Sequence, residues 1–208
     1  MNQNPDTPHL DTPNLPAIPF ELSWQQAPRS WELDEPFLSI TAGEKTDLFT
    51  DPRGGAAVDN APRLTFVPEG DFIFTTKVTV GFENTFDAGV LLLYQSETSW
   101  AKLCFEFAPQ GFPLVVSVVN KGTSDDCNGL FVDENNTWLR VARTGNAFAF
   151  HHSLDGDYWH LVRLFALEPN LETKVGFLVQ APTSESCTAL FSKLSFQQKT
   201  LSDVRSGM

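Results

Sequence analysis

Four side chains that could bind a ligand lie at alternate positions of two short segments, on the side opposite the apolar residues of each segment. Lys102 and Glu106 occupy the first segment, and Trp138 and Arg140 occupy the second. Because successive side chains of a β-strand point to opposite faces, we expect these four on one sheet face that turns away from the core. An aromatic plane beside charged groups can hold the apolar face and the hydroxyls of a sugar ring, so the pattern predicts a ligand-binding face.

Two further charged residues are assigned to the same face. Arg163 lies in another alternating segment, and Asp125 stands near the end of a strand or loop. A simpler interpretation is that these side chains only solvate the sheet and connect neighbouring strands, and both interpretations stay open at this point. The ligand-binding interpretation assigns contacts to Lys102, Glu106, Asp125, Trp138, Arg140 and Arg163.

Glycoside hydrolysis is the enzymatic alternative for such a groove. It requires two carboxyl groups roughly 5–9 Å apart across the scissile bond. Glu106 is the only acidic residue on its segment, and Asp87 and Asp125 can approach it only through the tertiary fold. No catalytic residue is therefore assigned, and we expect a binding protein rather than an enzyme.

Metal and cofactor sites have no defined pattern in this sequence. Residues 124–128 and 133–136 offer carboxylate and amide oxygens, but neither run follows the spacing of a calcium loop, and such residues are common in turns. Cys104, Cys127 and Cys187 show neither zinc-site nor disulfide spacing. We expect no metal and no cofactor.

Short apolar segments, separated by clusters of Gly, Asn, Asp, Pro and Ser, dominate the chain. No helical period of 3.6 residues recurs along the sequence. Many short strands at this spacing predict an all-β sandwich or barrel. The predicted strands are Phe37–Ile40, Arg63–Phe66, Phe72–Val80, Gly89–Tyr94, Lys102–Phe107, Leu114–Val119, Trp138–Arg143, Ala147–His152, Trp159–Phe165, Lys174–Val179 and Thr188–Phe196.

A single β-domain over residues 19–198 contains all of these predicted strands. Residues 1–18 are rich in proline among polar residues, so we expect a disordered arm there. Residues 199–208 are short and polar, and we expect a flexible tail.

The chain is strongly acidic, with 26 acidic and 14 basic residues and a net charge of −12. Binding to nucleic acid or to an anionic membrane requires clustered lysine and arginine, so neither is expected as a partner. The first residues lack the basic and apolar regions of a signal peptide, and no apolar run is long enough to span a membrane. Together with the unpaired cysteines this favours the cytoplasm, while a nuclear location stays open.

Several short motifs occur in a characteristic order over about residues 20–197. They are Thr46-Asp47-Leu48-Phe49, Gly70-Asp71-Phe72, Phe86-Asp87-Ala88-Gly89, Trp100-Ala101-Lys102 with Glu106, Ser124-Asp125, Trp138-Leu139-Arg140-Val141, Ser153-Leu154-Asp155-Gly156 with Trp159, and Val162-Arg163. In this order and spacing the chain resembles the DUF1349 family, a group of concanavalin A-like proteins. Fungal members of that family include the "regulation of enolase" protein, and similar modules are appended to some β-xylosidases.

The resemblance implies a jelly-roll β-sandwich of two antiparallel sheets, one of them concave, and a context in carbohydrate metabolism. It supplies no reaction, because the function of the family is largely undefined. Two positions depart from the family pattern, since relatives tend to have an aromatic residue where this chain has Asp126 and Trp where it has Phe49. If those aromatic residues stack on a ligand in relatives, stacking is weakened here.

Two functional hypotheses from different classes follow, with a weaker third. The first is a non-catalytic module that binds a saccharide or a small metabolite on the concave face. The second is a regulator that docks a metabolic enzyme of glycolysis, of the enolase type. The third is a glycoside hydrolase. Antiparallel sandwiches have edge strands that can pair, so we expect a monomer or a homodimer.

Overall fold

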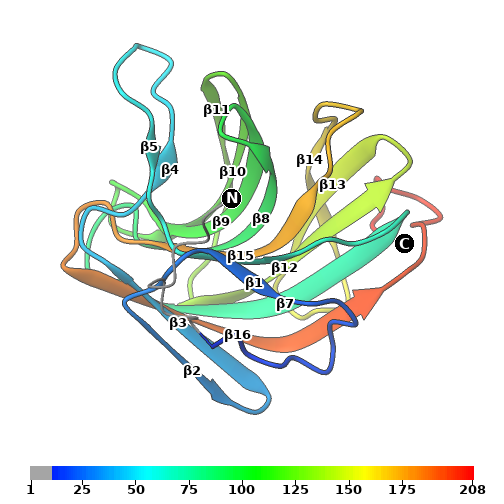
Figure 1. The fold of residues 1–208 in the computed structure, drawn as a ribbon, viewed down its shortest axis with the longest axis horizontal. Helices are drawn as coiled ribbons and strands as arrows, with labels where there is room; N and C mark the ends of the chain where they lie inside the picture. Colours follow the sequence, from blue (N-terminus) through cyan, green and yellow to red (C-terminus); the bar gives the residue numbers. More distant parts are fainter. Residues whose placement is uncertain (1–10) are drawn as a thin grey trace, which may run out of the picture.

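The computed structural model describes residues 11–208, which form sixteen β-strands and no helix (Figure 1). Two seven-stranded antiparallel sheets pack face to face, and a two-stranded hairpin stands on the outer side of one of them. The predicted sandwich and its two antiparallel sheets are therefore confirmed. Within the same residues no helix is long and apolar enough to cross a membrane.

Each sheet combines strands from distant parts of the chain. The first sheet contains, in spatial order, β1 (Ser23–Gln26), β6 (Arg63–Phe66), β15 (Lys174–Gln180), β8 (Ala88–Ser96), β9 (Ser99–Phe107), β10 (Pro113–Lys121) and β11 (Ser124–Phe131). The second sheet contains β14 (His160–Phe165), β13 (Ala147–Ser153), β12 (Asn136–Thr144), β7 (Phe72–Gly81), β16 (Ser186–Gln197), β3 (Phe37–Gly43) and β2 (Ser30–Asp34). The hairpin consists of β4 (Leu48–Phe49) and β5 (Val58–Asp59).

Every predicted strand overlaps an observed one, but the prediction misses β1, β2, β4, β5 and β11. The strand β11 shows why a real strand can escape prediction from the sequence. Nearly all of its side chains are exposed, so it lacks the alternation of apolar and polar residues that marks a half-buried strand. It is a strand because β10 supplies its backbone hydrogen-bond partners along one side.

The main core lies between the two sheets and is built from alternate residues of each strand. Phe105 of β9 and Leu139 of β12 are fully buried in it, as the alternation predicts. The ring of Phe177 packs against Phe74 and Phe191 of the opposite sheet, with centroids 5.5 and 4.7 Å apart. Each such aromatic pair contributes roughly 0.5–1.5 kcal/mol beyond burial, which fixes the spacing between the sheets.

The start of the described chain packs onto this core. Residues 1–10 lie outside the described residues, but Leu15 and Ile18 are buried with 5% and 6% of their surface exposed. The disordered arm expected over residues 1–18 is therefore wrong for its second part. Two apolar side chains among prolines are a weak sequence signal, yet burying each one stabilises the fold by about 1.5–3 kcal/mol.

The last residues of the chain are also packed. Leu201 is buried against Ile73 and Ala142 on the outer face of the second sheet. The flexible tail expected over residues 199–208 is therefore wrong, because Leu201 packs on the sheet and the side chains of Arg140 and His151 contact carbonyl oxygens of the tail.

Gly89 of β8 marks a point at which the two sheets approach each other closely. A Cβ atom at this position would lie 2.6 Å from Val78 Cγ2 on β7 and 2.9 Å from Ala189 Cβ on β16. Both distances are far below van der Waals contact between carbon atoms, which lies at about 3.5–4.0 Å. Only glycine fits without moving one sheet against the other.

We therefore predict that Gly89→Ala lowers the free energy of unfolding by about 1–3 kcal/mol, as overpacking does in other cores. Gly81→Ala is the matched control, because a Cβ atom there would meet only Thr188 O at 3.7 Å. Chemical denaturation of both variants measures the difference. An unchanged denaturation midpoint for Gly89→Ala would show that the sheets separate easily at this point.

Candidate functional site

The outer face of the first sheet holds a cleft of about 460 Å³. Lys102 of β9 and Val116 and Val118 of β10 face outward and line it. The β4–β5 hairpin, the loop before β8 and the edge strand β11 contribute the surrounding walls. The alternation that sends Phe105 into the core thus places its neighbours on the cleft side.

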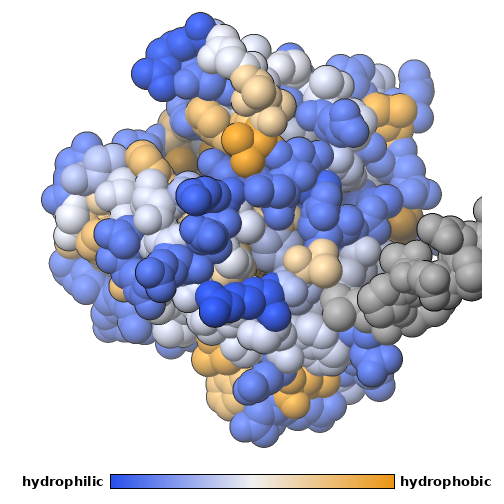
Figure 2. Space-filling model, turned by 60° about the vertical axis from the view of Figure 1, so that its left-hand side comes forward, coloured by the Kyte–Doolittle hydropathy of each residue, from blue (hydrophilic) through white to orange (hydrophobic). Residues whose placement is uncertain are grey.

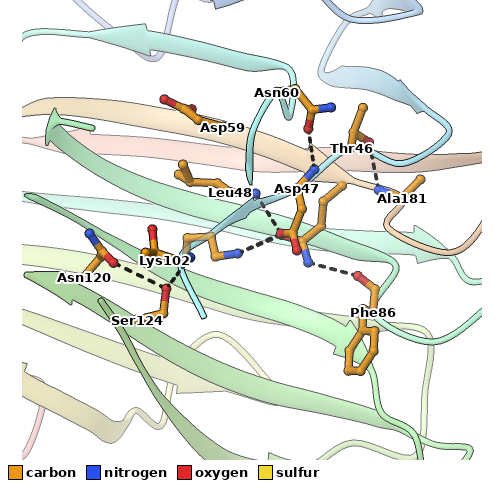
Figure 3. Close-up of polar contacts among 12 residues, drawn as sticks. Thr46, Asp47, Leu48, Asp59, Asn60, Phe86, Lys102, Asn120, Ser124 and Ala181 are labelled. Carbon is orange, nitrogen blue, oxygen red and sulfur yellow. Dashed lines mark hydrogen bonds and ion pairs between the residues drawn. The ribbon is translucent and has the colours of Figure 1, made fainter. Parts of the chain in front are cut away.

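The first arm of the hairpin is attached to the first sheet at two points (Figure 3). Thr46 and Ala181 exchange backbone hydrogen bonds of 3.3 and 3.2 Å. Further along the arm, the Thr50 N–H donates to Ser124 Oγ at 3.0 Å, and the Ser124 N–H donates to Thr50 O at 2.9 Å. Between these two points Leu48 is buried against the outward apolar side chains of the sheet. The arm therefore crosses the sheet from the end of β15 to β11.

Lys102 is almost completely buried, with 2% of its surface exposed. Its ammonium group donates to Gln180 Oε1 at 2.9 Å and to Asp47 Oδ1 at 3.3 Å, and it lies 5.6 Å from the centre of the Trp100 ring (Figure 3). Burial by itself would lower the pKa of this ammonium, but the surrounding acidic groups, Asp47 first, raise its pKa above the ordinary value. Lys102 therefore carries a positive charge at the base of the cleft.

Two acidic side chains of the cleft lie in surroundings that disfavour their charge. Burial raises the pKa of Glu106 to about 8, and the charge of Lys102 offsets this only in part. Burial also raises the pKa of Asp126 on β11. At neutral pH the Glu106 carboxyl is thus largely protonated, so it can donate a hydrogen bond as well as accept one. No three His, Cys, Asp or Glu side chains are grouped to hold a metal ion anywhere in residues 11–208.

Phe86 lines the cleft in an unusual backbone conformation. Its φ angle is 71°, in the left-handed region, and 40% of its surface is exposed. The turn is fixed by the buried Asp87 carboxylate, which accepts the N–H groups of Glu83 and Asn84 at 2.9 Å and the Ser184 hydroxyl at 2.7 Å. A non-glycine residue in this region costs roughly 1–3 kcal/mol, so the surroundings hold an aromatic ring at the cleft against its backbone preference.

Gln180 joins the cleft wall to the buried charge. Its Oε1 accepts from Lys102, and its Nε2 donates to the Phe86 carbonyl oxygen at 3.0 Å (Figure 3). Phe49 of the hairpin adds a second aromatic side chain to the lining. The cleft therefore combines two aromatic rings, an apolar floor and several polar side chains.

Trp138 and Arg140 do not lie in this cleft. They stand on β12 of the second sheet, whereas Lys102 and Glu106 stand on β9 of the first. The prediction that these four residues share one face is therefore wrong. Alternation correctly indicates that both pairs point away from the core, but it does not determine which sheet a strand joins.

Asp125 and Arg163 pair with each other outside the cleft. Arg163 Nη2 lies 3.0 Å from Asp125 Oδ2, and Nη1 donates to the Asp125 carbonyl oxygen at 3.0 Å. This ion pair connects β11 and β14, which are edge strands of different sheets. The structure thus separates the six expected site residues into three groups, of which Lys102 and Glu106 form the cleft pair.

The sequence reasoning missed several cleft residues. Asp47, Phe49 and Phe86 lie on loops or a very short strand, where periodicity gives no signal. The motifs of the family resemblance contain a usable signal, because those that begin at Thr46, Phe86, Trp100 and Ser124 all converge on this part of the first sheet.

The fold is shared with solved structures of low sequence identity. A functionally unknown protein from Saccharomyces cerevisiae is 22% identical with a TM-score of 0.80, over 86% of this chain and 97% of that one. The GH43 protein BlXynB from Bacillus licheniformis, as its K247S mutant, is 15% identical with a TM-score of 0.70, over 86% of this chain and 37% of that one. A xylan β-1,4-xylosidase from Bacillus halodurans is 13% identical with a TM-score of 0.61, over 93% of this chain and 41% of the enzyme.

These likenesses concern the β-sandwich, and the chain spans less than half the length of the two Bacillus proteins. Among curated proteins, no relative matches the sequence. The family model described as "Protein of unknown function (DUF1349)" matches residues 24–199. That range covers most of the sandwich, including the cleft, and the chain therefore belongs to the DUF1349 family.

Proposed function

We propose that this chain is a non-catalytic module that binds a carbohydrate or a small polar metabolite in the cleft on the first sheet. The observation that carries the proposal is the pairing of a buried, charged Lys102 with the strained, exposed Phe86 in one cleft. A buried charge and a strained backbone both cost stability, and such costs cluster at functional sites.

The polar groups of the cleft suit a ligand with several hydroxyl groups. An ammonium group has three donors, and Lys102 uses two of them on Gln180 and Asp47, which leaves one for a ligand. The protonated Glu106 carboxyl and the side chain of Asn128 offer both donors and acceptors. Phe49 and Phe86 supply apolar surface for the face of a sugar ring.

The structural neighbours suggest which sugars to test first. One neighbour is named as a xylan β-1,4-xylosidase, and this chain matches 41% of it. Xylose and xylo-oligosaccharides are therefore the first ligands for a titration, with other neutral pentose and hexose oligomers as the comparison set.

The alternative partner, a glycolytic enzyme, requires a protein-sized interface with an apolar centre. On the face shown in Figure 2, hydrophilic residues predominate and apolar residues form only small separate areas. This face offers no large apolar centre for a docked protein.

One observation favours a second candidate, glycoside hydrolysis. A carboxyl group with a pKa of about 8, as in Glu106, is protonated at neutral pH and suits a general acid. The strand register opposes this role, because Asp126 aligns with Val118 and Lys102, four residues along β9 from Glu106. The Cα atoms of the two acids are roughly 16 Å apart, so carboxyl groups at catalytic spacing would require both side chains to extend toward each other.

The variant Phe86→Gly should weaken ligand binding without lowering the stability of the fold. Glycine adopts positive φ without strain, so we predict an equal or higher free energy of unfolding for the variant. Loss of the ring should weaken binding of the best xylo-oligosaccharide about tenfold, or roughly 1.4 kcal/mol. Isothermal titration calorimetry measures the affinity and thermal denaturation the stability.

Lys193→Gly is the matched control, because Lys193 also has a positive φ, 53°, and does not line the cleft. It should leave the affinity unchanged. If no saccharide binds the parent protein at millimolar concentration, or if Phe86→Gly binds as tightly as the parent, the proposal fails. Release of reducing ends by the parent protein would instead support the hydrolase.

The raised pKa of Glu106 also predicts how the stability of the fold depends on pH. Its pKa rises from 4.5 to about 8 on folding, so the unfolded chain loses this proton before the folded chain does. Stability should therefore fall as pH rises from about 4.5 to about 8. Glu106→Gln should remove this loss and exceed the parent by on the order of 2 kcal/mol at pH 8, with little difference at pH 4.5. Urea denaturation at both pH values measures this difference in stability, and Glu69→Gln is the control because Glu69 is exposed. An equal pH dependence of stability in the parent and in Glu106→Gln would contradict the prediction.

A further inference from the structure

Two histidines lie side by side at one edge of the second sheet, away from the cleft. His152 stands on β13 and His160 on the edge strand β14, and the two residues are direct partners in the antiparallel register (Figure 1). Direct partners on antiparallel strands share one face of their sheet, with Cβ atoms roughly 4.5–5.5 Å apart. The centres of the two imidazole rings are 5.5 Å apart, and the ring planes are tilted by 46°.

The ring of His152 is buried without any polar contact in the described chain. Only 1% of the residue's surface is exposed, and within residues 11–208 neither Nδ1 nor Nε2 has a hydrogen-bond partner. A neutral imidazole has one N–H donor and one nitrogen with a free lone pair, and burying such groups without partners costs stability. Internal hydrogen bonding therefore does not explain a histidine at this position, whereas a ligand for the lone pair would.

The spacing of the two rings suits a shared metal ion. A zinc ion binds an imidazole nitrogen at about 2.0–2.1 Å, so it lies roughly 3.2 Å from the centre of that ring. Two rings that coordinate one ion at the tetrahedral angle therefore have centres about 5.2 Å apart. The observed 5.5 Å between His152 and His160 is close to this value, so one ion can join both rings while β13 and β14 keep their pairing.

His160 gives the pair access to solvent. It is exposed, whereas His152 is buried, so an ion between them would have the protein on one side and water on the other. Within residues 11–208, no group of three His, Cys, Asp or Glu side chains could hold a metal ion, so water would complete the coordination here. Imidazole nitrogen suits zinc, copper and nickel, whereas magnesium and calcium prefer oxygen ligands.

We propose that His152 and His160 form a two-histidine site for a divalent transition-metal ion, represented by zinc, that cross-links the edge strand β14 to β13. This site is independent of the cleft and of the proposed function, because it lies on the other sheet. Two protein ligands make it weaker than a closed site with four. The two rings meet only in the folded chain, so bound zinc also stabilises the fold.

The test is a titration of the full chain with zinc chloride at neutral pH, followed by isothermal titration calorimetry. A large excess of magnesium is present throughout, because magnesium occupies carboxylate oxygens without competing for imidazole. We expect one zinc ion per chain with a micromolar dissociation constant, and binding weaker by about tenfold or more in His160→Gln. Zinc should raise the thermal midpoint of the parent and leave that of His160→Gln unchanged.

His151→Gln is the matched control, because His151 is the adjacent residue on β13 and its Nε2 contacts the Val204 carbonyl oxygen at 2.7 Å. This variant should bind zinc as the parent does, and His152→Gln should lose binding as His160→Gln does. His160 is exposed, so His160→Gln decides the matter alone if His152→Gln does not fold. The proposal is overturned if the parent binds no zinc at millimolar concentration, if His160→Gln binds it as tightly as the parent, or if His151→Gln loses binding to the same extent.

Discussion

The ammonium group of Lys102 has to be satisfied inside a nearly dry part of the first sheet, and much of the surrounding structure follows from this. Its two partners come from separate parts of the chain, Asp47 before the hairpin and Gln180 at the end of β15. A buried charge that lost either partner would cost several kcal/mol. The ion pair of Lys102 with Asp47 therefore holds the first arm of the hairpin against the outer face of the first sheet. The cleft is the space left open beside this arm.

The outcome for the six expected site residues shows what alternation can and cannot determine. It correctly indicates that Phe105 and Leu139 point inward, and that their charged neighbours point outward. It cannot place Trp138 beside Lys102, because sheet membership depends on long-range pairing such as that of β12 with β7. The fold class, in contrast, could be predicted from the sequence. Assigning a β-sandwich requires only that the chain contain many short strands, not that the pairing of those strands be known.

Other features lie beyond sequence patterns because they depend on single contacts. The position of Phe86 results from three hydrogen bonds to the buried Asp87 carboxylate, and nothing in its local sequence indicates a left-handed turn at a phenylalanine. The attachment of the last residues depends on Leu201 and on the absence of a side chain at Gly207. The family motifs are more informative than periodicity about features of this kind. A motif specifies particular residues at particular positions, whereas periodicity specifies only which face of a strand is apolar.

The ion pair between Arg163 and Asp125 has a consequence for self-association. It fastens β14 to β11, and on the other side of the sandwich Trp24 of β1 and Trp31 of β2 lie in contact, with ring centroids 6.4 Å apart. Each outermost strand of one sheet thus contacts an outermost strand of the opposite sheet through side chains. Side-chain contacts that cover an edge strand are one way in which β-proteins hinder the pairing of a further strand.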